Sequence, residues 1–119
     1  MALLAQLVDG VVANKFVLDK QRHTIGRNAK NDITIDEVAV SSQHAVIESR
    51  ENSYLEGHCE YVLIDLSSTN GTYINGEKII EQQLMNGDLV RIAWSTFRFV
   101  DDNEFDLEKT TKILVGSQF

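Results

Sequence analysis

The stretch EYVLIDLSSTNGTYING, residues 60–76, carries the clearest structural pattern in the chain. Its first six residues and residues 72–74 are rich in β-branched and aromatic side chains, which favour strands. Small polar residues separate these two runs, and the stretch contains two Asn-Gly pairs. Both residues of such a pair tolerate the positive φ angles of tight turns. The stretch therefore predicts a strand, a turn, a second strand and a further turn.

Short strand-forming runs separated by polar turns continue along the chain, at spacings of roughly 8 to 12 residues. Candidate strands lie at 3–8, 15–19, 22–26, 44–49, 60–65, 72–74, 88–92 and 96–100. In the last of these, Phe97 and Phe99 share one face while Arg98 lies on the other, as in a half-buried strand. No apolar stripe of helical periodicity precedes residue 101. The pattern predicts an all-β sandwich or barrel.

The composition is that of one ordinary globular domain. The chain has 119 residues, of which 43% are apolar and 24% charged, so a single core is sufficient. No run approaches the roughly 18 to 20 apolar residues that span a bilayer, and residues 1–10 lack the basic start of a signal peptide. Cys59 is the single cysteine, so no disulfide can form within the chain. We expect a cytoplasmic protein that does not enter a membrane.

The charge balance limits the kind of anion that the chain can bind. The net charge is −7, which argues against nucleic acid as a partner because such binding depends on many Lys and Arg contacts to phosphate. Residues 1–31 carry five bases and two acids, whereas residues 32–119 carry six bases and sixteen acids. Local contacts to one phosphate group are compatible with this balance, but binding of a polyanion is not.

Three polar segments combine small hydroxyl side chains, an arginine and turn-forming residues. They are Gly26-Arg27-Asn28, the segment 40–44 (VSSQH) and the segment 67–72 (SSTNGT), the last followed by Asn75-Gly76. A phosphate group needs donors that converge on it, and an arginine fork with neighbouring hydroxyls supplies them. The three segments carry the side chains that such a site needs, but each of them alone is common in turns.

The order and spacing of these segments resemble the forkhead-associated (FHA) domain. The pattern is GR, then VSxxHA, then DxSSTNGTxxNG, and the resemblance covers about residues 3–100. It implies a β-sandwich of about eleven strands that binds phosphothreonine peptides with its loops and has neither catalytic activity nor a cofactor. On this basis we expect an FHA domain over residues 1–101 and an acidic, flexible tail over residues 102–119. A chain of this format looks like a bacterial signalling adaptor.

The resemblance implies a role for five residues in phosphopeptide binding. Arg27 and Ser41 match the phosphate-binding arginine and serine of the family. Ser42 stands where many members have Arg, Lys or Asn, so a second positive contact is missing. Thr69 and Asn70 match the pair that lies against the phosphothreonine methyl group and holds the peptide backbone.

Three further residues match positions that brace the loops in the family, namely Gly26, His44 and Asn75. Each also has a simpler interpretation. His44 begins an apolar strand, where a buried and hydrogen-bonded histidine is common, and Asn75 belongs to a turn in either case. We expect His44 to be structural and not catalytic.

The residue types also allow other functions. A hydrolase could use Ser41, His44 and Asp65, but the sequence has no nucleophile-elbow or oxyanion-hole motif. A metal site with His58 and Cys59 has little support, because adjacent residues on a strand point to opposite faces. A stronger alternative is an assembly module that uses the same loop face to bind an unphosphorylated partner.

The partner implied by the resemblance is a phosphothreonine-containing protein, either a Ser/Thr kinase or its substrate. The tail offers Thr110 and Thr111, each with an aliphatic residue three positions later, Ile113 and Leu114. FHA domains often read that position. A phosphorylated tail could therefore occupy the site of its own domain or of a neighbour at high effective concentration. The simpler alternative is an unmodified, solvated tail.

Overall fold

The computed structural model describes residues 2–51 and 59–101, which include eleven strands. The strands are β1 (Ala2–Val8), β2 (Val11–Val17), β3 (Arg22–Gly26), β4 (Ile33–Thr34), β5 (Ala45–Glu51), β6 (Cys59–Asp65), β7 (Thr72–Ile74), β8 (Glu77–Lys78), β9 (Glu81–Leu84), β10 (Leu89–Ile92) and β11 (Ser95–Asp101). None of the described residues is helical, and no described helix could cross a membrane.

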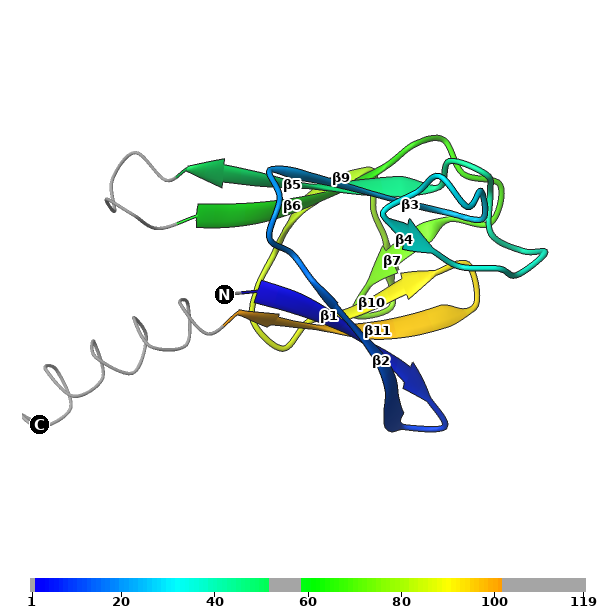
Figure 1. Cartoon of the computed structure of the whole chain (residues 1–119), viewed down its shortest axis with the longest axis horizontal. Helices are drawn as coiled ribbons and strands as arrows, with labels where there is room; N and C mark the ends of the chain where they lie inside the picture. Colours follow the sequence, from blue (N-terminus) through cyan, green and yellow to red (C-terminus); the bar gives the residue numbers. More distant parts are fainter. Residues whose placement is uncertain (1, 52–58, 102–119) are drawn as a thin grey trace, which may run out of the picture.

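The strands form two sheets that face each other (Figure 1). One sheet has the order β2-β1-β11-β10-β7-β8 and the other has the order β4-β3-β5-β6-β9. Paired strands are antiparallel, except that β3 and β4 are parallel. The prediction of an all-β sandwich with about eleven strands is confirmed.

The hydrophobic core lies between the sheets. Both Phe97 and Phe99 of β11 are completely buried, whereas Arg98 between them is exposed, so the predicted alternation is confirmed. Burying one such ring contributes roughly 1.5–3 kcal/mol. Apolar residues from both sheets complete the core, among them Leu4, Ile25, Ile47, Leu63, Val90 and Ile92. The loops therefore extend from a rigid framework.

The strand boundaries differ from the sequence prediction in places. Strand β2 begins at Val11, four residues before the predicted strand 15–19, and ends at Val17. Polar and small residues in its middle hide the pattern, because β2 is an edge strand and almost wholly exposed. Strands β4 and β8 have two residues each, and β9 reads EQQL, so none of the three has the apolar alternation of a recognisable strand.

The three Asn-Gly pairs adopt two kinds of backbone conformation. At Asn75-Gly76, between β7 and β8, both residues have positive φ angles of 51° and 87°. This is the conformation of a two-residue hairpin turn. At the pairs ending in Gly71 and Gly87, only the glycine has a positive φ. The turn from β1 to β2 uses Asp9-Gly10 instead, again with both angles positive.

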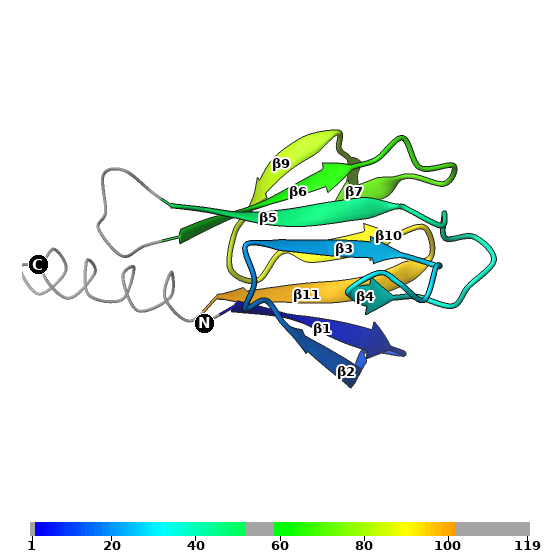
Figure 2. The ribbon, with the colours of Figure 1, turned by 45° about the horizontal axis from the view of Figure 1, so that its top comes forward.

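The two ends of the sandwich carry different parts of the chain, three loops at one end and the first and last described residues at the other. At one end lie the loop 27–32 after β3, the loop 35–44 before β5 and the loop 66–71 between β6 and β7, at the right of Figures 1 and 2. At the opposite end, Ala2 of β1 pairs with Asp101 of β11. The first and last described residues thus lie beside each other, away from the three loops.

Candidate functional site

The three loops at one end are joined by backbone hydrogen bonds. Arg27 N–H donates to the Ser41 carbonyl at 3.0 Å, and Leu66 N–H donates to the His44 carbonyl at 2.9 Å. Between the loops lies an open pocket of about 140 Å³, here called the Arg27 pocket. It is lined by Arg27, Val38, Ala39, Val40, Ser41, Thr69 and Asn70. The three segments found in the sequence therefore lie together in space.

The guanidinium of Arg27 is held by the backbone and not by an acid. Its Nη1 donates to the Val38 carbonyl at 3.3 Å. No ion pair joins Arg27 to any carboxylate in the described part of the chain. Since a guanidinium has five N–H donors, most of its hydrogen-bonding capacity and all of its charge are available to a ligand.

Ser41 and Thr69 meet across the pocket. The Thr69 N–H donates to the Ser41 hydroxyl oxygen at 3.1 Å, which leaves the hydroxyl proton of Ser41 available for donation. The Asn70 amide donates to the Ala39 carbonyl at 2.7 Å, and this bond ties loop 66–71 to loop 35–44. The pocket thus combines one cation, one hydroxyl donor and an amide with remaining polar capacity.

Gly26 allows loops 27–32 and 35–44 to approach closely. A Cβ atom at this position would lie 2.2 Å from the Ser42 carbonyl oxygen and 2.7 Å from Asn31 Nδ2. The Asn31 amide donates to the Ser42 carbonyl at 2.8 Å and to the Asn28 carbonyl at 2.9 Å. The backbone of Ser42 is therefore part of this clamp, while Ser42 is exposed and is not a lining residue of the Arg27 pocket.

His44 lies beneath the loops and is completely buried. Its Nδ1 accepts from the Ser41 N–H at 3.1 Å, and its Nε2 is 2.9 Å from the Gly71 carbonyl. These partners require the neutral tautomer with the proton on Nε2, so that Nε2 donates. A single imidazole therefore connects the segments that carry Ser41 and Gly71.

Asp65, at the end of β6, organises the start of loop 66–71. Its carboxylate accepts from the Ser68 hydroxyl at 2.6 Å, from the Ser68 N–H at 3.1 Å and from the Thr72 hydroxyl at 2.7 Å. Burial acts to raise the pKa of Asp65, but the hydrogen bonds from Ser68 and Thr72 outweigh it and hold the pKa below its ordinary value of 3.8. The carboxylate is thus occupied by neutral donors.

Asn75 braces a different part of the fold. Its amide donates to Asp88 Oδ1 at 3.0 Å, and its Oδ1 accepts from the Leu89 N–H at 3.0 Å. These bonds join the turn between β7 and β8 to the start of β10. Asn75 does not line the Arg27 pocket.

The contacts do not assemble a catalytic triad. In the described structure, the hydrogen bonds of His44 run to the Ser41 backbone and to Gly71, and the carboxylate of Asp65 is bound by Ser68 and Thr72. His58 lies outside the described residues, so the metal-site alternative is not tested. Within ranges 2–51 and 59–101, no three His, Cys, Asp or Glu side chains form a group that could hold a metal ion.

Two parts of the site have no clear signal in the sequence. Val38 and Ala39 line the pocket, and the Val38 carbonyl holds Arg27, but a backbone contact does not depend on side-chain type. Asn31 is buried between Asn28 and Ser42, although it reads as an ordinary turn residue. The predicted phosphosites Thr110 and Thr111 lie outside the described residues.

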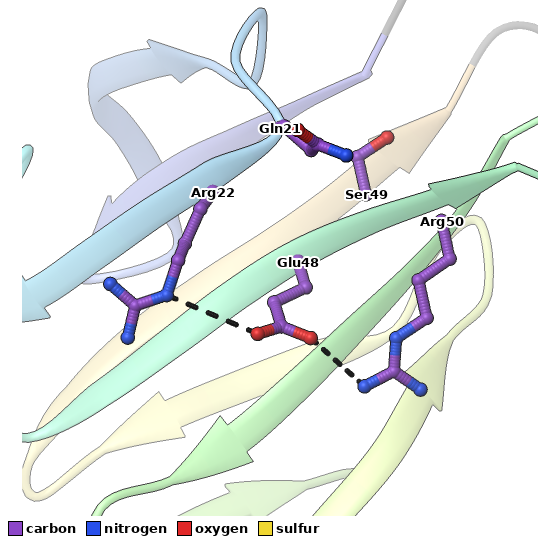
Figure 3. Close-up of a pocket in the computed structure, with 5 residues that line it drawn as sticks. All are labelled: Gln21, Arg22, Glu48, Ser49 and Arg50. Atoms are coloured by element: carbon purple, nitrogen blue, oxygen red, sulfur yellow. Dashed lines mark hydrogen bonds and ion pairs between the residues drawn. The ribbon is translucent and has the colours of Figure 1, made fainter.

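A larger hollow lies on the five-stranded sheet, and Figure 3 shows its lining residues. This Glu48 hollow has a volume of about 280 Å³ and is lined by Gln21, Arg22, Glu48, Ser49 and Arg50. The Glu48 carboxylate lies between the two arginines, 2.9 Å from Arg50 Nη2 and 3.9 Å from Arg22 Nε. The two arginines share Glu48, and Glu81 lies 3.5 Å from Arg50, so two carboxylates balance the two cations and the hollow lacks the free charge of the Arg27 pocket.

The fold and the pocket together define a class of protein. It is a β-sandwich binding domain whose loops place an arginine beside serine, threonine and asparagine side chains. The family model described as "FHA domain" matches residues 23–93, and the chain belongs to that family. Among curated relatives, it is 39% identical over 87 residues to the glycogen accumulation regulator GarA of Mycolicibacterium smegmatis. That match covers 73% of this chain and 49% of GarA.

A second relative is the oxoglutarate dehydrogenase inhibitor of Corynebacterium efficiens, 37% identical over 72% of this chain and 54% of the relative. The chain thus spans about half the length of these curated relatives. Among solved structures, it is similar to Mycobacterium tuberculosis EmbR in complex with a low-affinity phosphopeptide. The TM-score is 0.70 and the identity 33%, over 83% of this chain and 24% of EmbR.

Proposed function

We propose that the Arg27 pocket binds phosphothreonine in a protein partner and that the chain acts as a regulatory adaptor by binding, not by catalysis. One observation about Arg27 carries this proposal. Among the described residues its guanidinium is held by a backbone carbonyl and by no acid, and it lines one pocket with Ser41 and Thr69. Membership of the FHA family and the phosphopeptide bound to EmbR are consistent with it.

The pocket chemistry matches a phosphate monoester. A phosphothreonine carries about −1.5 to −2 charge and three acceptor oxygens. In this pocket, the guanidinium of Arg27 and the hydroxyl of Ser41 are the available donors, and Asn70 has amide capacity left for the peptide backbone. Ser42 brings no positive charge, so Arg27 carries the electrostatic part of recognition.

The apolar part of the lining favours phosphothreonine over phosphoserine. Val38, Ala39 and Val40 line the pocket together with Thr69. Burying one additional methyl group is worth roughly 0.8 kcal/mol for its transfer and 1–3 kcal/mol in a fitted pocket. We therefore expect phosphothreonine peptides to bind at least about fourfold more tightly than their phosphoserine copies.

The proposal also includes the domain limits and the cellular setting. The domain occupies residues 1–101, the tail 102–119 follows it, and the module acts in the cytoplasm on a kinase or a kinase substrate. The acids between residues 101 and 108 and the overall charge of −7 favour a protein partner over nucleic acid.

The test is a titration of the full chain with a library of phosphothreonine peptides, each paired with its unmodified and phosphoserine copies. We expect binding to be measurable for the phosphothreonine set and to fall by tenfold or more without the phosphate. Equal binding of modified and plain peptides would instead establish the assembly-module alternative, in which the same loops dock an unphosphorylated partner.

A further inference from the structure

The outer face of the six-stranded sheet has a one-sided charge distribution. The core residues Leu4, Phe97 and Val90 point inward, so the residues next to them along each strand point outward. The strand register aligns thirteen outward side chains in three rows that run across the sheet. The first row is Val17, Leu3 and Val100, and the second is Lys15, Ala5, Arg98 and Leu89. The third row is Val12, Leu7, Thr96, Arg91, Tyr73 and Lys78. We call this set the cationic face.

Four of these thirteen side chains are cations and none is an acid, although the chain has 18 acids and 11 Lys or Arg residues. The four are Lys15, Lys78, Arg91 and Arg98. Within the part of the chain that the structure describes, none of them forms an ion pair. Their charge is therefore presented to the outside.

The two arginines are positioned without being neutralised. The guanidinium of Arg91 lies 3.8 Å from the centre of the Tyr73 ring and donates to the Ala93 carbonyl at 2.6 Å. Arg98 donates to the Gly87 carbonyl at 2.8 Å. Each arginine is thus held by neutral groups, as Arg27 is in its pocket.

The opposite sheet shows that the arrangement does not reflect a lack of acids. There, Glu48 pairs with both Arg22 and Arg50 (Figure 3). Arg50 also lies 3.5 Å from Glu81. The outer face of the five-stranded sheet therefore neutralises its own cations, and the cationic face does not.

We propose that the cationic face is a second docking surface, which binds an extended acidic segment of a protein partner. Neighbouring strands are about 4.8 Å apart and successive same-face residues about 6.6 Å apart, so the Cα atoms of Arg98 and Arg91 are separated by roughly 8 Å. Carboxylates at every second position of an extended chain are about 7 Å apart, which matches this spacing.

The apolar residues of the same face extend the contact. Val12 and Leu89 lie beside the cations and are 47% and 37% exposed. An acidic segment with an occasional aliphatic side chain therefore finds both kinds of partner group. A long polyanion or an anionic membrane is a poorer match, as the charge balance of the sequence predicts, because its extended charge meets the −7 net charge of the whole chain. A short segment with a few carboxylates meets only the face.

The experiment uses the full chain and an unphosphorylated probe, the end-blocked peptide ETELETE, titrated by NMR at low and physiological salt. The face variant is Lys15→Gln with Arg98→Gln. Its matched control is Arg22→Gln with Arg50→Gln on the opposite sheet, which removes the same charge. We expect the face variant to weaken probe binding roughly fivefold to tenfold and the control to change it less than twofold.

Three results would overturn the proposal. They are equal weakening by the two double variants, loss of probe binding in Arg27→Ala, and preferential binding of phosphatidylglycerol vesicles at physiological salt. Phosphothreonine-peptide affinity is measured with the same proteins, and we expect the face variant to leave it unchanged. The docking surface and the proposed phosphothreonine site can therefore fail independently of each other.

Discussion

The Arg27 pocket and the Glu48 hollow use the same kind of side chain with opposite results. The hollow is larger, about 280 Å³ against about 140 Å³, and contains two arginines where the pocket contains one. Its arginines are already bound to Glu48, whereas Arg27 is bound to a neutral carbonyl. An anion site therefore depends on unneutralised charge with free donors, and not on volume or on the number of cations.

At the loop end, the acid that precedes the loop carrying Thr69 is engaged by neutral donors. Asp65 lies at the end of β6, beside the loop that carries Thr69, but its carboxylate accepts hydrogen bonds from Ser68 and Thr72. The hydroxyls of this loop thus have two uses. They fix its conformation and they occupy the carboxylate of Asp65.

The largest difference between the two regions is expected when each loses an arginine. Arg27→Ala removes several charge-assisted hydrogen bonds, each worth roughly 1.5–3 kcal/mol, so phosphothreonine-peptide affinity should fall tenfold to a hundredfold or more. Arg50→Ala removes the same charge from the Glu48 hollow and should change the affinity less than twofold. Calorimetric titration of both variants makes the comparison, and equal losses would show that overall charge, and not the pocket, controls binding.

Gly26 tests whether the pocket depends on the close approach of its loops. Because a Cβ atom would lie 2.2 Å from the Ser42 carbonyl oxygen, Gly26→Ala should lower the free energy of unfolding by about 1–3 kcal/mol and also weaken peptide binding. Gly76→Ala is the control, since its position has a positive φ but open space around the added atom. Denaturant unfolding and titration of both variants should show a binding defect only in Gly26→Ala.

Substitution of Asp65 tests whether its ionised carboxylate, bound by Ser68 and Thr72, stabilises the fold. Its pKa in the folded state is below the ordinary value of 3.8, so the ionised carboxylate stabilises the fold above that pH and this contribution is lost as the pH falls through the folded pKa. Asp65→Asn should be less stable by about 1 kcal/mol at pH 7. The gap between the melting temperatures of the two proteins should narrow below about pH 4. A constant gap from pH 7 to pH 2 would contradict this account.

The smallest effect is expected when the charge of Glu48 is removed, so that an arginine of the Glu48 hollow lacks an acidic partner, as Arg27 does in its pocket. Glu48→Gln leaves Arg22 and Arg50 without their shared carboxylate, although Arg50 retains Glu81 at 3.5 Å. The variant should acquire weak, roughly millimolar binding of inorganic phosphate, visible as NMR shifts of the two guanidinium groups. Wild type is the control, and identical shifts in both proteins would indicate that Glu48 does not suppress anion binding.

Much of the fold could be predicted because its strands have one buried face. The alternation of Phe97, Arg98 and Phe99 is a direct consequence of that burial, and the Asn75-Gly76 hairpin follows from the tolerance of both residues for positive φ. The exposed edge strand β2 and the two-residue strands β4 and β8 lack such a pattern, because their conformation is set by neighbouring strands and not by their own side chains.

The site could be predicted as a set of segments but not as a set of contacts. Arg27, Ser41 and Thr69 meet in one pocket, as their order and spacing indicated. The anchoring of Arg27 by the Val38 carbonyl and the burial of Asn31 depend on the path of the backbone, which side-chain types do not reveal. Asp65 begins the DxSSTNGTxxNG motif, but the sequence suggested a role for it only in the hydrolase alternative, and the structure places it as the organiser of loop 66–71.

The pairing of Ala2 with Asp101 has a consequence for how the domain can be joined to other proteins. Because the two ends of the described fold are neighbours at the pole opposite the Arg27 pocket, the domain has the geometry of a cassette (Figure 2). It could be inserted into a surface loop of an unrelated host with little separation between the junctions. The end with the Arg27 pocket would then project outward from that host.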